Sequence, residues 1–194
     1  QSRWGVQLYN DYNFCAMFYI AGNHGLLTDG MVLNLVDNHL EQLPSGVCKG
    51  NLLGRLLIRR EFDHNQLYVI PVEIPRHSLG TNFHYLQALY ALKQKYISIA
   101  ICEHYEEMLE LLRYIEKHWP RLADDIERGN SYVQSDPERA NAIREIMEPH
   151  HIGSQMVAQL WPGLHCIMVY DVDHLSTSFE LLRTYCGNNI HFVF

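Results

Sequence analysis

The chain has 194 residues, with 15 lysine and arginine residues against 22 aspartate and glutamate residues, so its formal net charge is −7. Hydrophobic residues make up 47% and charged residues 19%, a composition that excludes a disordered chain and is typical of one globular domain. The acidic balance argues against nucleic-acid binding, which needs a concentrated basic surface. No apolar run in the sequence approaches the roughly 20 residues that a membrane span needs.

Residues 1–80 give few clear elements. Thr28 and Asp29 are typical of a helix start, and apolar residues follow at helical spacing, so we expect a helix over residues 28–40. Residues 52–58 and 67–74 are predicted strands that a polar turn joins. Pro71 places the second strand at a sheet edge or a bulge, because proline cannot donate to a sheet ladder.

The central part of the chain predicts helices. Gly80 to Asn82 precede a helix whose apolar face is Phe83, Leu86, Leu89 and Leu92. The strongest helical pattern covers residues 98–118, where apolar side chains recur at three- and four-residue steps. Trp119 and Pro120 are then expected to begin a further short helix that ends at Gly129.

The last third alternates between helix and strand. Asp136-Pro137-Glu138 is a well-formed helix start, and residues 164–170 form an apolar run of strand length. Thr177 and Glu180 fit a capping box for a helix over residues 179–185, and residues 190–194 are expected to form a buried strand. This alternation predicts one α/β unit over residues 1–194, with a parallel or mixed sheet and crossover helices.

The five cysteines are Cys15, Cys48, Cys102, Cys166 and Cys186. They are widely spaced and include no Cys-x-x-Cys pair, so we expect neither a disulfide scaffold nor a structural zinc site. Cys102 and Cys166 lie in apolar stretches and are predicted core residues. This usage favours a reducing compartment such as the cytoplasm, although a secreted protein whose signal had been removed would show the same pattern.

The sharpest local pattern is an apolar strand followed by Asp171-Val172-Asp173. It resembles the nucleophile motif of haloacid-dehalogenase-like phosphatases, in which one carboxylate attacks phosphorus and the other transfers a proton beside magnesium. That motif normally opens its domain, whereas few residues follow His174 here, so a strand end followed by a helix cap is the preferred interpretation. In either case Asp171, Asp173 and His174 follow a strand of the predicted parallel sheet, where open α/β sheets bind ligands.

The other polar clusters carry weaker signals. Glu103 and Glu107, with His104 nearby, lie on one side of the predicted long helix and could be drawn as a metal site, but a solvated face is the commoner explanation. The 12 histidines are scattered, and no metal site is expected. The sequence has no Gly-x-x-x-x-Gly-Lys loop, no Gly-x-Gly-x-x-Gly and no Gly-x-Ser-x-Gly elbow, so it contains no self-sufficient catalytic motif.

Three segments beyond Thr81 carry a family resemblance. Trp119 to Gly129 is similar to a "Trp … Leu … Asp-Ile … Gly" segment, Leu160-Trp161-Pro162-Gly163-Leu164 to an "Ile/Leu-Trp-Pro-x-Leu" segment, and Tyr185-Cys186-Gly187 to a "Tyr-x-Gly" helix end. In this order they resemble the auxin-responsive acyl acid–amido synthetases, which are adenylate-forming enzymes, and their animal relatives. The resemblance covers residues 81–194.

The resemblance implies an N-terminal domain of the adenylate-forming type, which uses ATP and Mg²⁺ to activate a carboxylic acid and then transfers the acyl group to an amino acid. This chemistry requires a Ser/Thr/Gly phosphate loop, a Tyr-x-Ser-Ser-Glu-like segment and a mobile lid. None of them occurs in these 194 residues, so no catalytic residue is transferred and no cofactor is expected in this chain alone. ATP and Mg²⁺ would be needed by an active full-length protein.

In the family, the matching part helps to wall the acyl-acid pocket, chiefly with the helix from Ser98 and the strand ending at Tyr170. The candidates for a substrate pocket are therefore Ser98, Ile101, Tyr105, Asp171, Asp173 and His174.

We therefore expect part of an amido-synthetase-like, acyl-activating domain that is catalytically incomplete by itself. The alternative is a non-catalytic relative, a pseudoenzyme that binds a small acid or another protein. The apolar strand over residues 190–194 would leave a sheet edge to be covered by another segment of the protein or by another subunit, including a second copy. Nucleic acid and a membrane span are not expected.

Overall fold

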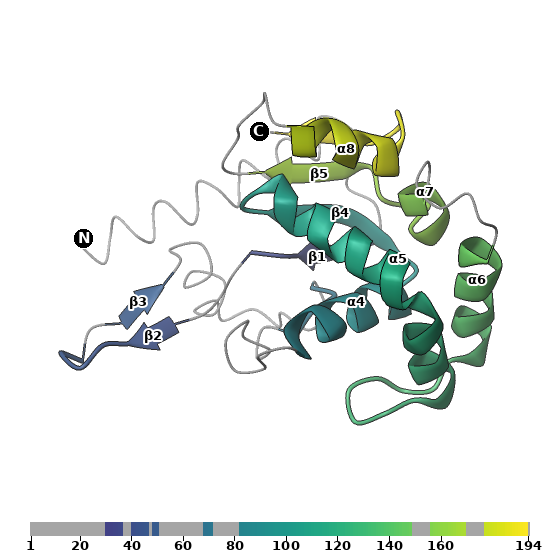
Figure 1. Ribbon diagram of the computed structural model, residues 1–194, viewed down its shortest axis with the longest axis horizontal. Helices are drawn as coiled ribbons and strands as arrows, with labels where there is room; N and C mark the ends of the chain where they lie inside the picture. Colours follow the sequence, from purple (N-terminus) through teal and green to yellow (C-terminus); the bar gives the residue numbers. More distant parts are fainter. Residues whose placement is uncertain are drawn as a thin grey trace.

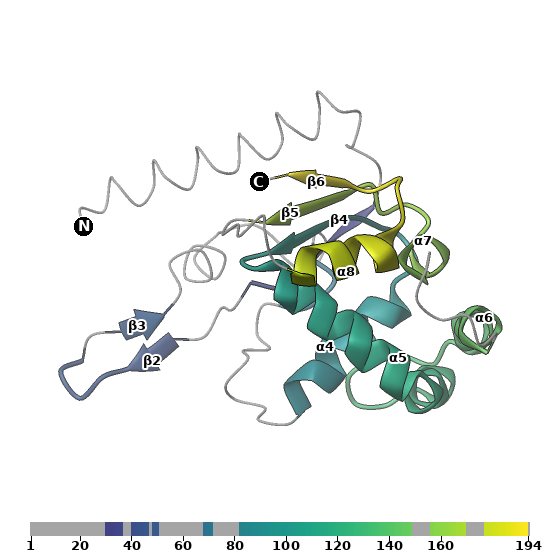
Figure 2. The same cartoon turned by 45° about the horizontal axis from the view of Figure 1, so that its top comes forward.

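The computed structural model describes residues 30–36, 40–46, 48–50, 68–71, 82–148, 156–169 and 177–193. Within these ranges a four-stranded sheet has the order β1-β4-β5-β6, and every neighbouring pair of strands is parallel (Figures 1 and 2). The strands are β1 (Met31–Asn34), β4 (Ile97–Cys102), β5 (Cys166–Val169) and β6 (His191–Val193). The predicted α/β class with a parallel sheet is confirmed.

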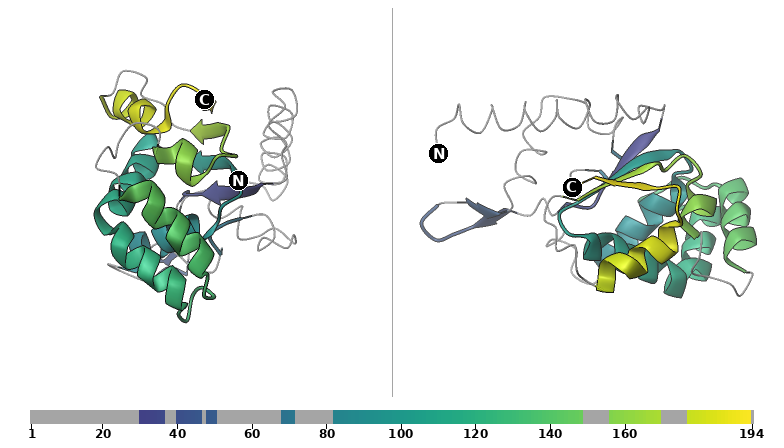
Figure 3. Two further views of the ribbon diagram at one scale, coloured as in Figure 1. Left: turned by 90° about the vertical axis from the view of Figure 1, so that its right-hand side faces the viewer. Right: turned by 90° about the horizontal axis from the view of Figure 1, so that it is seen from above.

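Helices connect successive strands of the sheet. The helices are α4 (Phe83–Lys93), α5 (Tyr105–Arg128), α6 (Pro137–Met147), α7 (Met156–Leu160) and α8 (Thr177–Cys186). α4, α5 and α8 lie on the same face of the sheet, and α6 packs against α5 (Figures 2 and 3). Each helical connection carries the chain back to the start of the next strand, which makes the strands parallel.

A separate antiparallel pair is formed by β2 (Leu40–Gln42) and β3 (Cys48–Gly50). It extends away from the four-stranded sheet (Figure 1). In the turn between the two strands, Gly46 has φ +78° and its N–H donates to the carbonyl of Leu43. This positive φ is readily accessible only to a residue without a side chain.

The helix predicted over residues 28–40 is wrong at its centre, because Met31–Asn34 is a strand. β1 pairs with β4, and Leu33 and Val32 are buried on opposite sides of the sheet. Apolar residues at 31, 35, 36 and 40 suggested a helix, but a short buried strand also gives an apolar run without alternation.

The helix predicted over residues 98–118 is also wrong at its start, because Ile97–Cys102 is strand β4. Every residue of β4 is buried, since the strand lies between β1 and β5 with side chains packed on both faces. The β-branched residues Ile97, Ile99 and Ile101 favour an extended backbone, and this preference outweighs the apparent helical spacing.

The second short helix predicted from Trp119 is not separate, because α5 continues through Pro120 to Arg128. Proline inside a helix removes one backbone hydrogen bond and costs about 3 kcal/mol. The helix continues because the buried stripe of its first half resumes with Leu122, Ala123 and Ile126. It ends at Gly129, as the sequence predicted, with φ +74° and its N–H donating to the carbonyl of Asp125.

The C-terminal elements largely confirm their predictions. Asp136 caps α6, with its carboxylate accepting a hydrogen bond from the backbone N–H of Arg139, and residues 166–169 form the predicted strand β5. α8 begins at Thr177 itself, two residues before the expected start. The strand predicted over residues 190–194 is the shorter β6, and its three residues are exposed or half-buried rather than buried, because β6 is the outermost strand of the described sheet.

The two faces of the sheet pack separately. The larger core joins α4, α5 and α8 to one face, with Leu33, Ala100 and Ile167 on the strands. The other face carries a second buried cluster that contains strand residues and Tyr68: Val32, Val36, Tyr68, Ile99, Ile101, Cys166 and Met168. Side chains that alternate along β4 therefore belong to two different environments.

Of the two strands predicted between residues 52 and 74, residues 52–58 lie outside the described residues. In the second, Tyr68 forms an isolated parallel bridge with Val32, and the N–H of Val69 donates to the carbonyl of Val32 at 2.9 Å. This segment lies along the outer edge of β1, which agrees with the edge position predicted from Pro71.

Candidate functional site

The proposed pocket residue Ser98 lies at the amino end of β4, buried to 3% exposure. Its hydroxyl donates to the carbonyl of Met31 across 3.5 Å. A side chain at Gly30 would meet the Cβ of Ser98 at 2.7 Å, so the backbone of Gly30 passes directly over it. In the described structure, the small side chain of Ser98 allows β1 to approach β4 closely.

Ile101 and Tyr105 lie near the opposite, carboxyl end of β4, but they face different layers. Ile101 belongs to the second buried cluster, on the sheet face opposite the larger core, together with Met168. Tyr105 is the first residue of α5 and belongs to the larger core. The structure therefore does not bring Ser98, Ile101 and Tyr105 together, and two of the three are on a strand, not on the helix expected from Ser98.

Tyr105 takes part in an aromatic cluster at the carboxyl end of the sheet. Its ring centroid is 5.8 Å from that of Phe179 in α8, and Phe179 is 5.1 Å from Phe192 in β6 in an edge-to-face arrangement. The guanidinium of Arg183 lies 5.9 Å from the Phe179 centroid. Aromatic pairs of this geometry stabilise packing, and here they join α5, α8 and β6.

Asp171, Asp173 and His174 lie outside the described residues. The paired positions Cys102 and Val169 show that β4 and β5 reach their carboxyl ends side by side. Glu103 and His104 follow β4 at that edge, and Asp171 follows β5 in the sequence. This edge of the sheet therefore remains the position predicted for a ligand by the general rule for α/β folds.

Glu107 has a structural partner at this edge. Its carboxylate accepts a hydrogen bond of 2.9 Å from the backbone N–H of Glu103, just before α5. An acidic side chain in the first turn of a helix is also favoured by the helix dipole. Among the described residues, no group of three or more His, Cys, Asp or Glu side chains could hold a metal ion.

Cys102, Cys166 and Cys186 are buried thiols. Burial raises the pKa of Cys102, at the end of β4, and the nearby carboxylate of Glu107 raises it further. Burial also raises the pKa of Cys166 to about 11 and that of Cys186 to about 12. A nucleophilic cysteine needs a lowered pKa and access to substrate, so these three thiols suit the core role predicted for Cys102 and Cys166.

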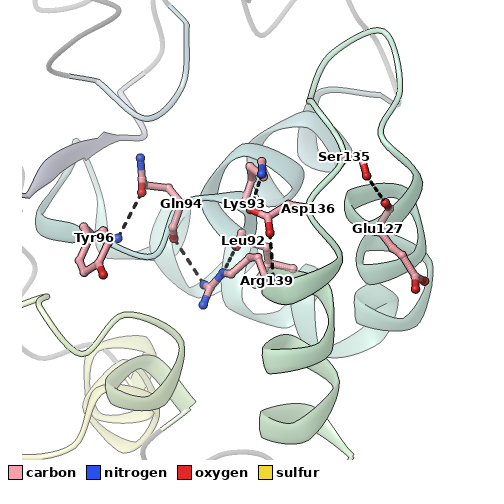
Figure 4. A network of polar contacts seen from close by, with 8 residues as sticks. All are labelled: Leu92, Lys93, Gln94, Tyr96, Glu127, Ser135, Asp136 and Arg139. Atoms are coloured by element: carbon pink, nitrogen blue, oxygen red, sulfur yellow. Dashed lines mark hydrogen bonds and ion pairs between the residues drawn. The ribbon is translucent and has the colours of Figure 1, made fainter.

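A buried arginine organises the amino end of the sheet (Figure 4). Arg139, in α6, is 7% exposed, and its Nε donates to the carbonyl of Leu92 at 2.6 Å. Its Nη2 donates to the carbonyl of Leu160 at 3.0 Å and to that of Gln94 at 3.4 Å. Burial lowers the pKa of Arg139, and the charge of Asp136 opposes that shift.

No sequence pattern marks Arg139, although the helix start beside it is predicted. Its partners lie 47 and 21 residues away along the chain, at the carboxyl ends of α4 and α7. The carboxyl end of a helix presents unpaired carbonyls and a partial negative charge, which suit a buried cation. Such a contact depends on the tertiary arrangement, and no local pattern in the sequence indicates it.

The segment around Trp161 stabilises the fold. It is one of the three segments that carry the family resemblance. The indole N–H of Trp161 donates to the carbonyl of Ala91 at 2.9 Å, and the whole side chain is buried. The N–H of Leu164 donates to the carbonyl of Trp161, which forms the turn into β5. A Cβ on Gly163 would lie 3.3 Å from the carbonyl oxygen of Ile97 at the start of β4.

The other two segments of the resemblance have similar roles. Gly187 ends α8 with φ +75°, and the hydroxyl of Tyr185 donates to the carboxylate of Glu116 at 2.8 Å, which ties α8 to α5. In the segment that ends at Gly129, the carboxylate of Asp125 accepts a hydrogen bond of 2.8 Å from Tyr85 of α4. These residues hold helices together, and none of these contacts supplies a reactive group.

A known protein family matches most of the chain. A family model described as the GH3 family N-terminal domain matches residues 7–190. The chain belongs to this family. The GH3 match begins well before Thr81, where the resemblance found in the sequence began, so the family assignment also includes the N-terminal part.

Solved structures show the same fold. The chain is similar to "GH3.15 acyl acid amido synthetase", with TM-score 0.73 and 16% identity over 97% of this chain and 37% of that one. It is also similar to "AtGH3.15 acyl acid amido synthetase in complex with 2,4-DB", with TM-score 0.78 and 15% identity over 97% of this chain and 36% of that one. The chain thus spans a little over a third of the length of these proteins.

A comparison with curated protein sequences gives no significant match. Of the helices in the described ranges, none is long and apolar enough to cross a membrane.

Proposed function

We propose that this GH3 segment belongs to a protein that activates a carboxylic acid with ATP and Mg²⁺ and transfers the acyl group to an amine. The observation that carries the proposal is the match of the GH3 family N-terminal domain to residues 7–190. The described fold supports it, because two solved structures titled as GH3.15 acyl acid amido synthetase share that fold at TM-scores of 0.73 and 0.78.

The segment's own contribution is a scaffold. A parallel sheet lines up the carboxyl ends of β4 and β5, where open α/β folds bind ligands. Of the proposed pocket residues, Ile101 and Tyr105 lie near this edge on different sides of the sheet, while Ser98 supports the strand from its other end. Asp171, Asp173 and His174 follow β5 in the sequence, and we propose that they complete the pocket at this edge. The ATP-binding segments that the resemblance calls for are absent from the 194 residues, so ATP and Mg²⁺ would act only in the full protein.

The test is magnesium-dependent exchange between ATP and pyrophosphate, measured with a panel of aromatic and aliphatic acids. We expect exchange with the natural protein that contains this segment and none with the 194-residue chain. If the natural protein is folded by circular dichroism but gives no exchange with any acid, the proposal is wrong.

A non-catalytic relative is the second candidate function. The observation that favours it is the lack of a Thr-Ser-Gly-Thr-Ser-like phosphate loop anywhere in residues 1–80. Such a pseudoenzyme would bind an acid without turnover, so calorimetry would detect acid binding to the natural protein while exchange stays at background. Membership of the GH3 family disfavours the phosphatase interpretation of Asp171 and Asp173.

We also propose that the outer side of β6 is covered by another segment of the full protein or by a second subunit. In the described sheet β6 pairs with β5 alone, and Phe192 and Val193 are only half-buried. An open strand edge promotes pairing with another chain, and a lysine there discourages it.

Light scattering of the 194-residue chain tests whether the open edge of β6 causes self-association. We expect a mass above that of a monomer, a shift to monomer in Val193→Lys, and no shift in Tyr132→Lys, which changes an exposed tyrosine between α5 and α6. A wild-type chain that stays monomeric at high concentration would contradict self-association.

A further inference from the structure

We draw no further inference here: the strongest candidate, the surface patch just before β4 where Tyr96 is exposed beside Lys95, is a partly apolar face, and nothing in the described part of the chain shows what covers it.

Discussion

The guanidinium of Arg139 and the carbonyl oxygen of Leu160 lie 3.0 Å apart, which links α6 to the last residue of α7. The same side chain binds the carbonyl of Leu92 in the last turn of α4. Since α4 leads into β4 and α7 leads into β5, one buried cation holds the two connections that start the central strands.

Replacing Arg139 with methionine tests this link. Methionine keeps much of the apolar volume but leaves three carbonyl groups without their donor, and we expect a loss of about 2–4 kcal/mol in the free energy of unfolding. Arg139→Lys should lose less stability than Arg139→Met, because lysine keeps the positive charge. It should still be less stable than the wild type, because lysine cannot reach all three oxygens. Urea unfolding followed by circular dichroism measures both variants.

Arg144→Met is the matched control, since Arg144 lies on the same helix but forms its ion pairs with Asp124 and Glu127 near the surface. It should be clearly milder than Arg139→Met, because exposed ion pairs contribute little. Equal losses in the two variants would show that Arg139 has no special role.

Gly129→Ala tests the turn between α5 and α6. Gly129 has φ +74°, and an added Cβ would lie 2.7 Å from the backbone nitrogen of Ser135. We expect a loss of about 1–3 kcal/mol, measured by the same unfolding experiment. Gly46→Ala is the control, because Gly46 has a similar φ of +78° but nothing within 4 Å of the new atom. The clash predicts a larger loss at Gly129, and the reverse order would refute it.

These features show which parts of the fold the sequence could predict. Several local signals were reliable, although the helix start expected at Trp119 does not occur. The cap at Asp136, the glycines that end helices at Gly129 and Gly187, and the apolar strand β5 all appear where expected. Each depends on backbone conformation within a few residues, which residue type controls directly.

The wrong predictions concern segments whose local sequence fits both a strand and a helix, so that tertiary packing decides between them. β4 alternates Ile with Ser and Ala, and all of it is buried, so its apolar pattern fits a strand or one side of a helix. Placing Ser98 on a helix then grouped it with Ile101 and Tyr105, although strand geometry sends Ser98 to the other end of the sheet and Ile101 to the other face. Arg139 was missed because its partners are distant in sequence.

The ion pair of Asp136 predicts a pH dependence. The hydrogen bond from Lys93, followed by that from the backbone N–H of Arg139, lowers the pKa of Asp136 below its ordinary value. A group whose pKa is lower in the folded state stabilises the protein above its unfolded pKa of about 3.9, and this stability is lost as the pH falls through the folded value.

In Asp136→Asn the side chain keeps an oxygen that can cap α6, but it cannot ionise. The stability of this variant should therefore fall less than that of the wild type between pH 6 and pH 3. Urea midpoints collected across this range measure the difference. The same slope in both proteins would show that the pairing with Lys93 does not couple Asp136 to folding.

Cysteine alkylation tests the packing of the sheet itself. Cys102, Cys166 and Cys186 are buried, and burial raises the pKa of each thiol, so at pH 8 little thiolate is present and the reagent has no access. With iodoacetamide and peptide mapping, we expect modification of these three to be at least about 100-fold slower in buffer than in 8 M urea, because reaction requires opening of the core.

Arg139→Met should speed the labelling of Cys166 most, since that residue begins the strand that follows α7. Rapid labelling of Cys102 in the folded wild type would contradict the burial of β4.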